Sequence, residues 1–90
     1  MSYVRPRQRL DANHSEILAA LQRVTNAVSL AAVGGGCADV LAQHRAGHLV
    51  LIELKTPGGR VRPSQRLFAE RWPVVVARTS EEALRAVGIS

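Results

Sequence analysis

The sequence predicts a single α/β domain with the element order αβββαβα, in which one small sheet is flanked by helices. Three observations support this fold class. The 90 residues suffice for one domain and are too few for two. A hydrophobic fraction of 47% with 21% charged residues is typical of a globular chain and too apolar for intrinsic disorder. Finally, apolar segments alternate between helical spacing and short strand-like runs that glycine and proline separate.

The expected elements follow in order along the chain. The first helix begins after Asn13, a favourable N-cap with Glu16 in the capping-box position, and apolar residues at helical spacing carry it to about Thr25. A second capping box, formed by Thr79 and Glu82, opens the last helix. The remaining expected segments are strands at 28–33, 39–43, 48–55 and 73–77 and helices at 64–71 and 79–88.

Basic residues dominate the charge balance. Twelve basic residues against seven acidic ones give a formal net charge of +5, and Lys55 is the single lysine. Arginine forms paired hydrogen bonds to phosphate, so this excess favours a polyanionic partner. An arginine-rich composition that reflects GC-rich coding alone is the alternative. Because Tyr3, Phe68 and Trp72 are the only aromatic residues, a protein that stacks single-stranded bases on aromatic side chains is not expected. Any nucleic acid would be held by its backbone.

Several classes of protein are excluded by what the sequence lacks. No apolar run approaches the roughly 20 residues of a membrane-spanning helix. A secretory signal requires an apolar stretch after its basic region, and the basic arm at residues 1–10 has none. Residues 11–90 form the expected domain. A lone cysteine, Cys37, cannot form an internal disulfide or a cysteine-based zinc site. We therefore expect a reduced, cytoplasmic protein that binds no membrane.

A predicted hairpin brings two carboxylates face to face. The loop Arg45-Ala46-Gly47 fits a three-residue hairpin turn with glycine in the left-handed conformation. The resulting register pairs Asp39 with Glu53, whose Cβ atoms would lie about 5 Å apart, and strand alternation places Lys55 on the same face. Like charges at this distance oppose folding unless a positive charge lies between them. A hard divalent cation with oxygen ligands would supply it.

A structural ion pair is the alternative explanation for these charges. Lys55 would then neutralise one of the two acids without any catalytic role. The residues around Glu53 are apolar on both sides, which predicts a buried or half-buried strand. A charge in such a strand is costly unless it is paired or used, so both interpretations stay open at this point.

Four segments together resemble a nuclease family. The series "NHSEILAAL", "VGGGCADVL", "LVLIELK" and "SQRLFAERW" resembles the PD-(D/E)xK nuclease superfamily, and within it the VRR-Nuc group, whose virus-type members are stand-alone domains of about this size. The likeness extends from about residue 13 to residue 76. One departure is Ala38, which stands where the motif has proline, at a position that shapes the turn and carries no catalytic group.

The resemblance implies a fold, an activity and a setting. The fold is restriction-endonuclease-like, with a small mixed sheet in the αβββαβα core. The activity is Mg²⁺- or Mn²⁺-dependent DNA endonuclease cleavage, with branched DNA such as four-way junctions as substrate and a homodimer as the working unit. The implied setting is a bacterial or phage-infected cell.

The resemblance also assigns roles to individual residues. Lys55 orients or deprotonates the attacking water, and Gln65 supports the site from the following helix. The expected metal ligands are two strand acids, one backbone carbonyl and one helix acid: Asp39, Glu53, Leu54 and Glu16. Two of these residues have equally simple structural explanations. Glu16 fits a capping box, and Gln65 fits the first turn of its helix.

Arginines surround the loop that follows the expected catalytic strand. Arg60, Arg62 and Arg66 can bind DNA phosphates beside the cleaved bond, although a solvated basic loop explains each one singly. The triplet 34–36 lacks the lysine of a phosphate loop and predicts a tight connection. The three histidines lack metal-ligand spacing, and small-residue packing explains Cys37. Two rival functions remain, namely a non-catalytic nucleic-acid-binding module and a structural subunit of a larger complex.

Overall fold

A four-stranded mixed sheet forms the centre of the computed structural model, which describes residues 13–90. The predicted order αβββαβα is confirmed, and the basic arm expected at 1–10 lies outside the described residues. The elements are α1 (His14–Val24), β1 (Ala27–Ser29), β2 (Val40–Gln43), β3 (Leu49–Leu54), α2 (Pro63–Arg71), β4 (Val74–Ala77) and α3 (Ser80–Ala86). Within residues 13–90, none of the helices has the length and apolar character needed to cross a membrane.

The strands lie in the order β1-β2-β3-β4. Pairing is antiparallel between β1 and β2 and between β2 and β3, whereas β4 pairs with β3 in parallel after the crossover through α2. The predicted hairpin register is confirmed, since Gln43 lies opposite Leu49 and Leu41 opposite Leu51. Gly47 has the expected positive φ of 108°, which only glycine adopts at little cost. The β2–β3 register therefore follows from the turn.

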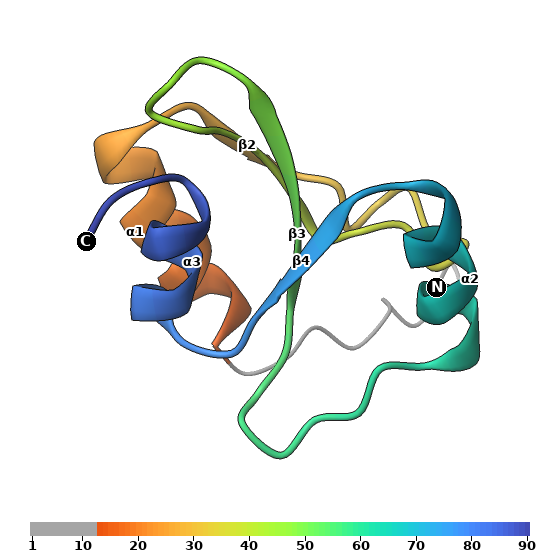
Figure 1. The fold of residues 1–90 in the computed structure, drawn as a ribbon. Helices are drawn as coiled ribbons and strands as arrows, with labels where there is room; N and C mark the ends of the chain where they lie inside the picture. Colours follow the sequence, from red (N-terminus) through yellow and green to blue (C-terminus); the bar gives the residue numbers. More distant parts are fainter. Residues whose placement is uncertain (1–12) are drawn as a thin grey trace, which may run out of the picture.

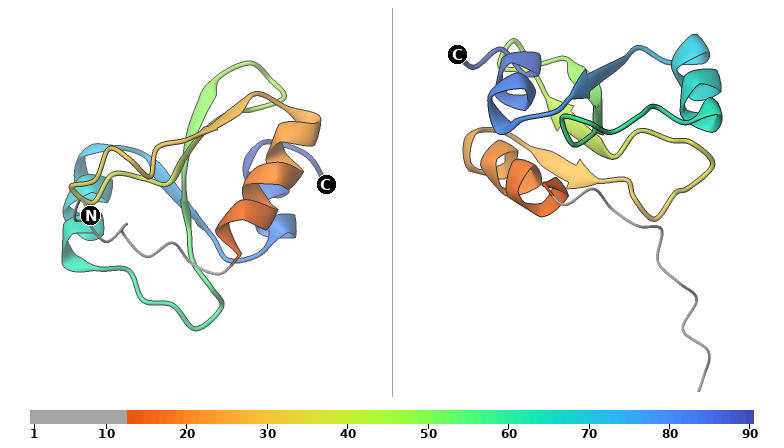
Figure 2. Two further views of the ribbon diagram at one scale, coloured as in Figure 1. Left: turned by 180° about the vertical axis from the view of Figure 1, so that it is seen from behind. Right: turned by 90° about the horizontal axis from the view of Figure 1, so that it is seen from below.

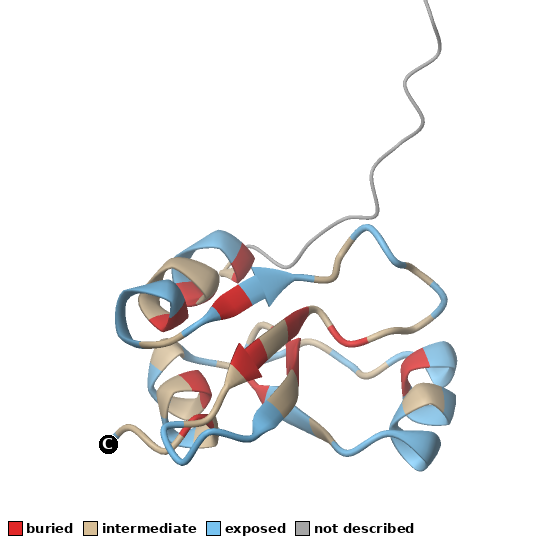
Figure 3. Cartoon of the chain, turned by 90° about the horizontal axis from the view of Figure 1, so that it is seen from above, coloured by how far each residue is buried: buried red, intermediate tan, exposed pale blue. Residues whose placement is uncertain are grey.

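Helices α1 and α3 pack side by side against one face of the sheet (Figures 1 and 2). We call this the inner face. Its strand residues interlock with the apolar sides of the two helices, and the fully buried large side chains are Ile17, Leu21, Val40, Ile52, Leu54 and Val87. Figure 3 shows the buried residues concentrated on the strands and on the sides of α1 and α3 that face them. This interface is the hydrophobic core.

The opposite, outer face is covered only in part. Helix α2 lies on this side of the sheet, away from α1 and α3 (Figures 1 and 2). Strand β3 is half-buried at Val50 and Leu51 and buried in its second half, so the expectation of a buried or half-buried strand fails only at Leu49, which is 65% exposed. Apolar residues on this face therefore meet solvent near the hairpin.

Two local predictions were wrong. Asn13 makes no side-chain cap on α1; its Nδ2 atom instead donates to the carbonyl oxygens of Lys55 (3.3 Å) and Arg78 (3.0 Å). These tertiary bonds override the capping-box pattern and join the start of α1 to the ends of β3 and β4. The first strand ends at Ser29 instead of residue 33, because a turn closed by the Val33 amide and the Leu30 carbonyl (2.9 Å) follows it.

The second capping box is half formed. Thr79 accepts a hydrogen bond from the Glu82 amide (3.1 Å), as predicted for the N-cap of α3. The Glu82 carboxylate, however, accepts from the amide of Arg78 (2.7 Å), one residue before the cap. The start of α3 is thus tied to the end of β4.

Candidate functional site

Asp39 lies where the chain enters β2, and main-chain bonds fix it opposite Glu53. The Asp39 amide donates to the Ile52 carbonyl (3.1 Å), and the Leu54 amide donates to Oδ2 of the Asp39 carboxylate (2.8 Å). These two bonds bracket Glu53 on β3, so the predicted Asp39–Glu53 opposition continues the β2–β3 register by one pair. The Asp39 side chain is held directly before the start of β2, an interior strand, and is half-buried.

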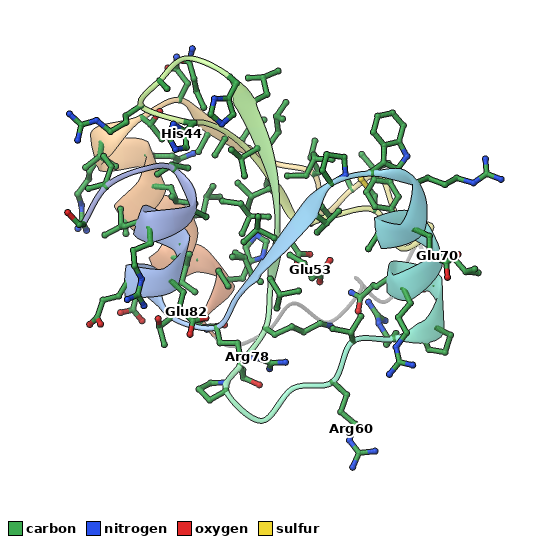
Figure 4. The ribbon with its side chains drawn as sticks, in the orientation of Figure 1. His44, Glu53, Arg60, Glu70, Arg78 and Glu82 are labelled. Carbon is green, nitrogen blue, oxygen red and sulfur yellow. The ribbon has the colours of Figure 1, made fainter. Side chains whose placement is uncertain are left out.

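Glu53 is a buried acid on the outer face. It is 3% exposed and points away from α1 and α3, toward the side of α2 (Figure 4). Its Oε2 atom accepts a hydrogen bond from Nε2 of Gln65 (2.8 Å) and lies 3.7 Å from Nζ of Lys55. Lys55 is itself only 6% exposed. The structure therefore brings four predicted site residues together: Asp39, Glu53, Lys55 and Gln65.

Burial, together with the hydrogen bond and the charge of the neighbouring Asp39 carboxyl, raises the pKa of Glu53 to about 8. The positive charges of Lys55 and Arg62 act against this rise without cancelling it. The ion pair between Lys55 and Glu53 thus exists, but it does not fully compensate the two acids. A further positive charge nearby would favour the ionised form of Glu53.

Gln65 makes a contact suited to each of the two roles expected of it. Its Oε1 atom accepts from the Arg62 amide (2.8 Å) at the start of α2, while its Nε2 atom donates to Glu53. The side chain is 5% exposed, so it is fixed at both ends inside the protein. Gln65 therefore links the Glu53 carboxylate to the start of α2 and orients that carboxylate.

The glycine triplet positions α2. Gly36 has a φ of 82°, and a Cβ atom there would collide with the main chain of Ser64, next to Gln65. Only glycine lets the connection before Asp39 approach the helix this closely. The predicted tight connection is wrong, because residues 30–39 separate β1 from β2; the glycine instead seats the helix that carries Gln65.

Glu16 is not brought to this site. It is exposed on α1, and no hydrogen bond joins it to Asp39 or Glu53. Among residues 13–90, no three or more His, Cys, Asp or Glu side chains gather as metal ligands. The candidate metal ligands that remain together are the Asp39 and Glu53 carboxylates and the Leu54 carbonyl on the same strand. Carboxylate and carbonyl oxygens are the donors that a hard divalent cation prefers, so this set fits Mg²⁺ or Mn²⁺.

An arginine groove lies beside the acids. Arg60, Arg62 and Arg66, the predicted DNA-binding residues, line one open groove together with Arg78. Arg62 is close enough to Glu53 to lower its pKa, which places the groove next to the acid pair. Arg78 was missed in the sequence because it lies 12 residues beyond Arg66. The signal that points to it is the parallel register of β3 and β4, which sets Arg78 beside Lys55.

The remaining candidates do not form sites. Burial and the nearby Asp39 and Glu53 carboxyls raise the pKa of the Cys37 thiol, which argues against a reactive thiolate. His44 and His48 stack on each other at the hairpin, with ring centroids 4.3 Å apart. His14 is buried on α1. Comparison of the chain with protein-family models, curated proteins and solved structures found no match.

Proposed function

We propose that this protein is a metal-dependent DNA endonuclease that hydrolyses phosphodiester bonds, with the restriction-endonuclease-like fold of the virus-type VRR-Nuc group. The observation that carries the proposal is the placement of Asp39 opposite Glu53, with Lys55 and Gln65 in contact with Glu53. Two acids held this close, with a raised pKa on one of them, are costly for folding and suited to cation binding.

The chain's own residues have distinct roles in this proposal. Asp39, Glu53 and the Leu54 carbonyl would hold Mg²⁺ or Mn²⁺. A cation bound there supplies a water of lowered pKa and a sink for the negative charge of the transition state. As an ammonium group, Lys55 places a compact positive charge beside the reacting phosphate and orients the attacking water, whereas deprotonating that water requires the neutral amine. Gln65 keeps the Glu53 carboxylate in one orientation through its 2.8 Å bond.

The arginine groove supports DNA as the substrate. Arg60, Arg62 and Arg66 present guanidinium groups next to the acid pair, and guanidinium binds phosphate oxygens in pairs of parallel hydrogen bonds. Such contacts bind the DNA backbone and do not distinguish one base sequence from another, which agrees with selection of DNA by shape. The nuclease resemblance adds branched DNA and four-way junctions as the preferred shapes. In this proposal the enzyme acts in the cytoplasm of a bacterial or phage-infected cell.

A homodimer is the assembly that the proposal requires for cutting two strands, and the outer face offers a surface for it. We call Val28, Leu41, Leu49, Leu51, Val74 and Val76 the open apolar patch. By strand register these side chains share the face of Glu53, and three of them are 40–65% exposed. Apolar patches of this kind mark interaction surfaces, and a stable interface needs about 800 Å² from each partner.

The dimer is tested by sedimentation equilibrium. Leu49→Glu places a charge in the open apolar patch and should convert the protein to monomer. Leu67→Glu is the matched control, since Leu67 is 64% exposed on α2 outside the patch. Wild type that sediments as monomer, or equal effects of the two substitutions, would remove the dimer from the proposal.

The nuclease activity is tested with a labelled four-way junction and a matched linear duplex in Mn²⁺, Mg²⁺ or EDTA. Wild type should cut only with metal, and Glu53→Gln should reduce cutting by at least about 10³-fold, because an amide removes a charged ligand. Glu70→Gln is the control, since Glu70 is exposed on α2 (Figure 4).

The rival functions predict different results in this assay. Salt-dependent DNA binding with no cutting in any metal, unchanged by Glu53→Gln, would identify a non-catalytic binding module. Absence of both binding and cutting would favour a structural subunit. A protein that cuts equally well with Glu53→Gln would contradict the assigned site.

A further inference from the structure

Arg78 joins the end of β4 to the loop that follows β3. It directly follows β4 (Val74–Ala77), and the Lys55 amide donates to the Ala77 carbonyl (3.0 Å), so Arg78 begins beside Lys55. Its Nη1 atom donates to the carbonyl oxygens of Thr56 (2.8 Å) and Gly59 (2.7 Å), with a longer contact to Pro57 (3.4 Å). All three acceptors belong to residues 56–59, which begin directly after Lys55. Figure 4 shows Arg78 at the base of this loop.

The main chain of Arg78 is anchored on two sides. Its amide donates to Oε1 of Glu82 in α3 (2.7 Å), and its carbonyl accepts from Asn13 at the start of α1 (3.0 Å). The side chain therefore extends from a rigid base. By contrast, the segment between β3 and α2 forms no helix or strand. Among its main-chain bonds is the one from the Gly59 amide to the Thr56 carbonyl (2.9 Å).

Guanidinium bonds to carbonyl oxygens are charge-assisted, and so stronger than bonds between neutral groups. Two bonds of 2.7 and 2.8 Å from one nitrogen hold the carbonyls of Thr56 and Gly59 at a fixed separation. The next two arginines along the chain are Arg60 and Arg62, which line the groove beside the acid pair. The position of these two side chains relative to Glu53 thus depends on the shape of the 56–59 turn.

We propose that Arg78 is a positioning residue: it clamps the turn at residues 56–59 and thereby sets Arg60 and Arg62 at the DNA backbone next to Asp39 and Glu53. The clamp itself follows from the bonds to the turn, whereas its consequence for DNA rests on the proposed function. In this arrangement Arg78 acts through the loop arginines and not through a phosphate contact of its own.

The clamp is tested by hydrogen exchange of the loop amides. Arg78→Met removes the side-chain hydrogen-bond donors of Arg78 and keeps a side chain of similar length. The Gly59 amide should then exchange at least about tenfold faster, while the amides of the β2–β3 hairpin stay protected. Arg78→Lys should restore much of the protection, because an ammonium group also donates several hydrogen bonds from one nitrogen. Arg85→Met, an exposed arginine of α3, is the control for loss of one charge. Unchanged exchange in Arg78→Met would overturn the clamp.

The effect on DNA is tested by a double-mutant cycle of affinity between Arg78 and Arg62. Arg78→Met should weaken binding about tenfold relative to Arg85→Met, and Arg62→Ala should cost much less affinity in the Arg78→Met background than in wild type. Costs that simply add would show that Arg78 contributes an independent charge, which contradicts positioning. If wild type binds no DNA, the proposed function fails, and hydrogen exchange alone still decides whether Arg78 clamps the loop.

Discussion

The inner face of the sheet buries apolar side chains and the outer face buries an acid, although adjacent residues of one strand supply both. Ile52 and Leu54 point to the inner face and pack under α1 and α3. Glu53 lies between them and is equally buried, at 3% exposure, but on the outer face beside Asp39 and Lys55. Burial of apolar side chains stabilises the fold, whereas burial of the Glu53 carboxyl beside that of Asp39 opposes it.

The difference indicates which face serves stability and which serves chemistry. On the inner face each buried side chain has a packing partner, so folding explains it fully. On the outer face burial and Asp39 keep the pKa of Glu53 raised although Lys55, Arg62 and Gln65 lie around it. The outer face therefore carries a cost that folding alone does not explain, and a bound cation would offset it.

The largest effect on stability is expected from the inner face. Ile52→Ala should lower the free energy of unfolding by about 2–5 kcal/mol, because it leaves a cavity at a fully buried position. Urea unfolding measures the loss, with exposed Leu67→Ala as the control, expected within about 0.5 kcal/mol of wild type. If Ile52→Ala and Leu67→Ala had equal costs, the inner face would not be the core.

Titration of Glu53 on the outer face should make the free energy of unfolding depend on pH. The folded protein keeps a proton on Glu53 up to a pKa of about 8, whereas the unfolded chain releases it near 4.5. The folded state thus binds more protons in this window, and the free energy of unfolding of the metal-free protein should fall as pH rises through it. The expected slope is at most about 1.4 kcal/mol per pH unit, levelling off above pH 8.

Urea unfolding in EDTA at several pH values measures this slope. Glu53→Gln should flatten it, because the amide does not titrate, while Glu70→Gln should keep it. Parallel pH profiles for wild type and Glu53→Gln would mean that the buried acid is already compensated. The contrast between the two faces would then disappear.

The smallest expected effect concerns single arginines of the groove. Arg66→Ala should weaken DNA binding modestly and reduce the slope of log affinity against log salt by about 0.9, since one phosphate contact is lost. Arg71→Ala on the same helix is the control, because Arg71 does not line the groove. Equal slopes for the two variants would indicate a diffuse basic surface instead of a groove.

The sequence predicts those parts of the site that depend on local rules. Gly47 sets the turn, the turn sets the register, and the register places Asp39 opposite Glu53. Strand alternation then predicts which side Lys55 takes. These inferences need only the period of a strand and the geometry of a three-residue hairpin.

Other parts depend on tertiary contacts that local patterns do not contain. Asn13 has the pattern of a helix cap, yet the ends of β3 and β4 offer it carbonyl partners that only the folded chain brings near. The Arg78 clamp likewise requires the parallel pairing of β3 with β4. Glu16 shows the reverse case, because the family resemblance assigns it to a site to which the fold does not bring it.

We propose that the acids of the outer face bind a divalent cation, and calorimetric titration with Mn²⁺ measures this binding. At pH 8.5, above the pKa of about 8 of Glu53, wild type should bind Mn²⁺. Asp39→Asn should weaken that binding at least about tenfold, because a charged ligand is lost, while exposed Glu70→Gln should leave it unchanged. Equal binding by all three proteins, or no binding by wild type, would contradict the claim.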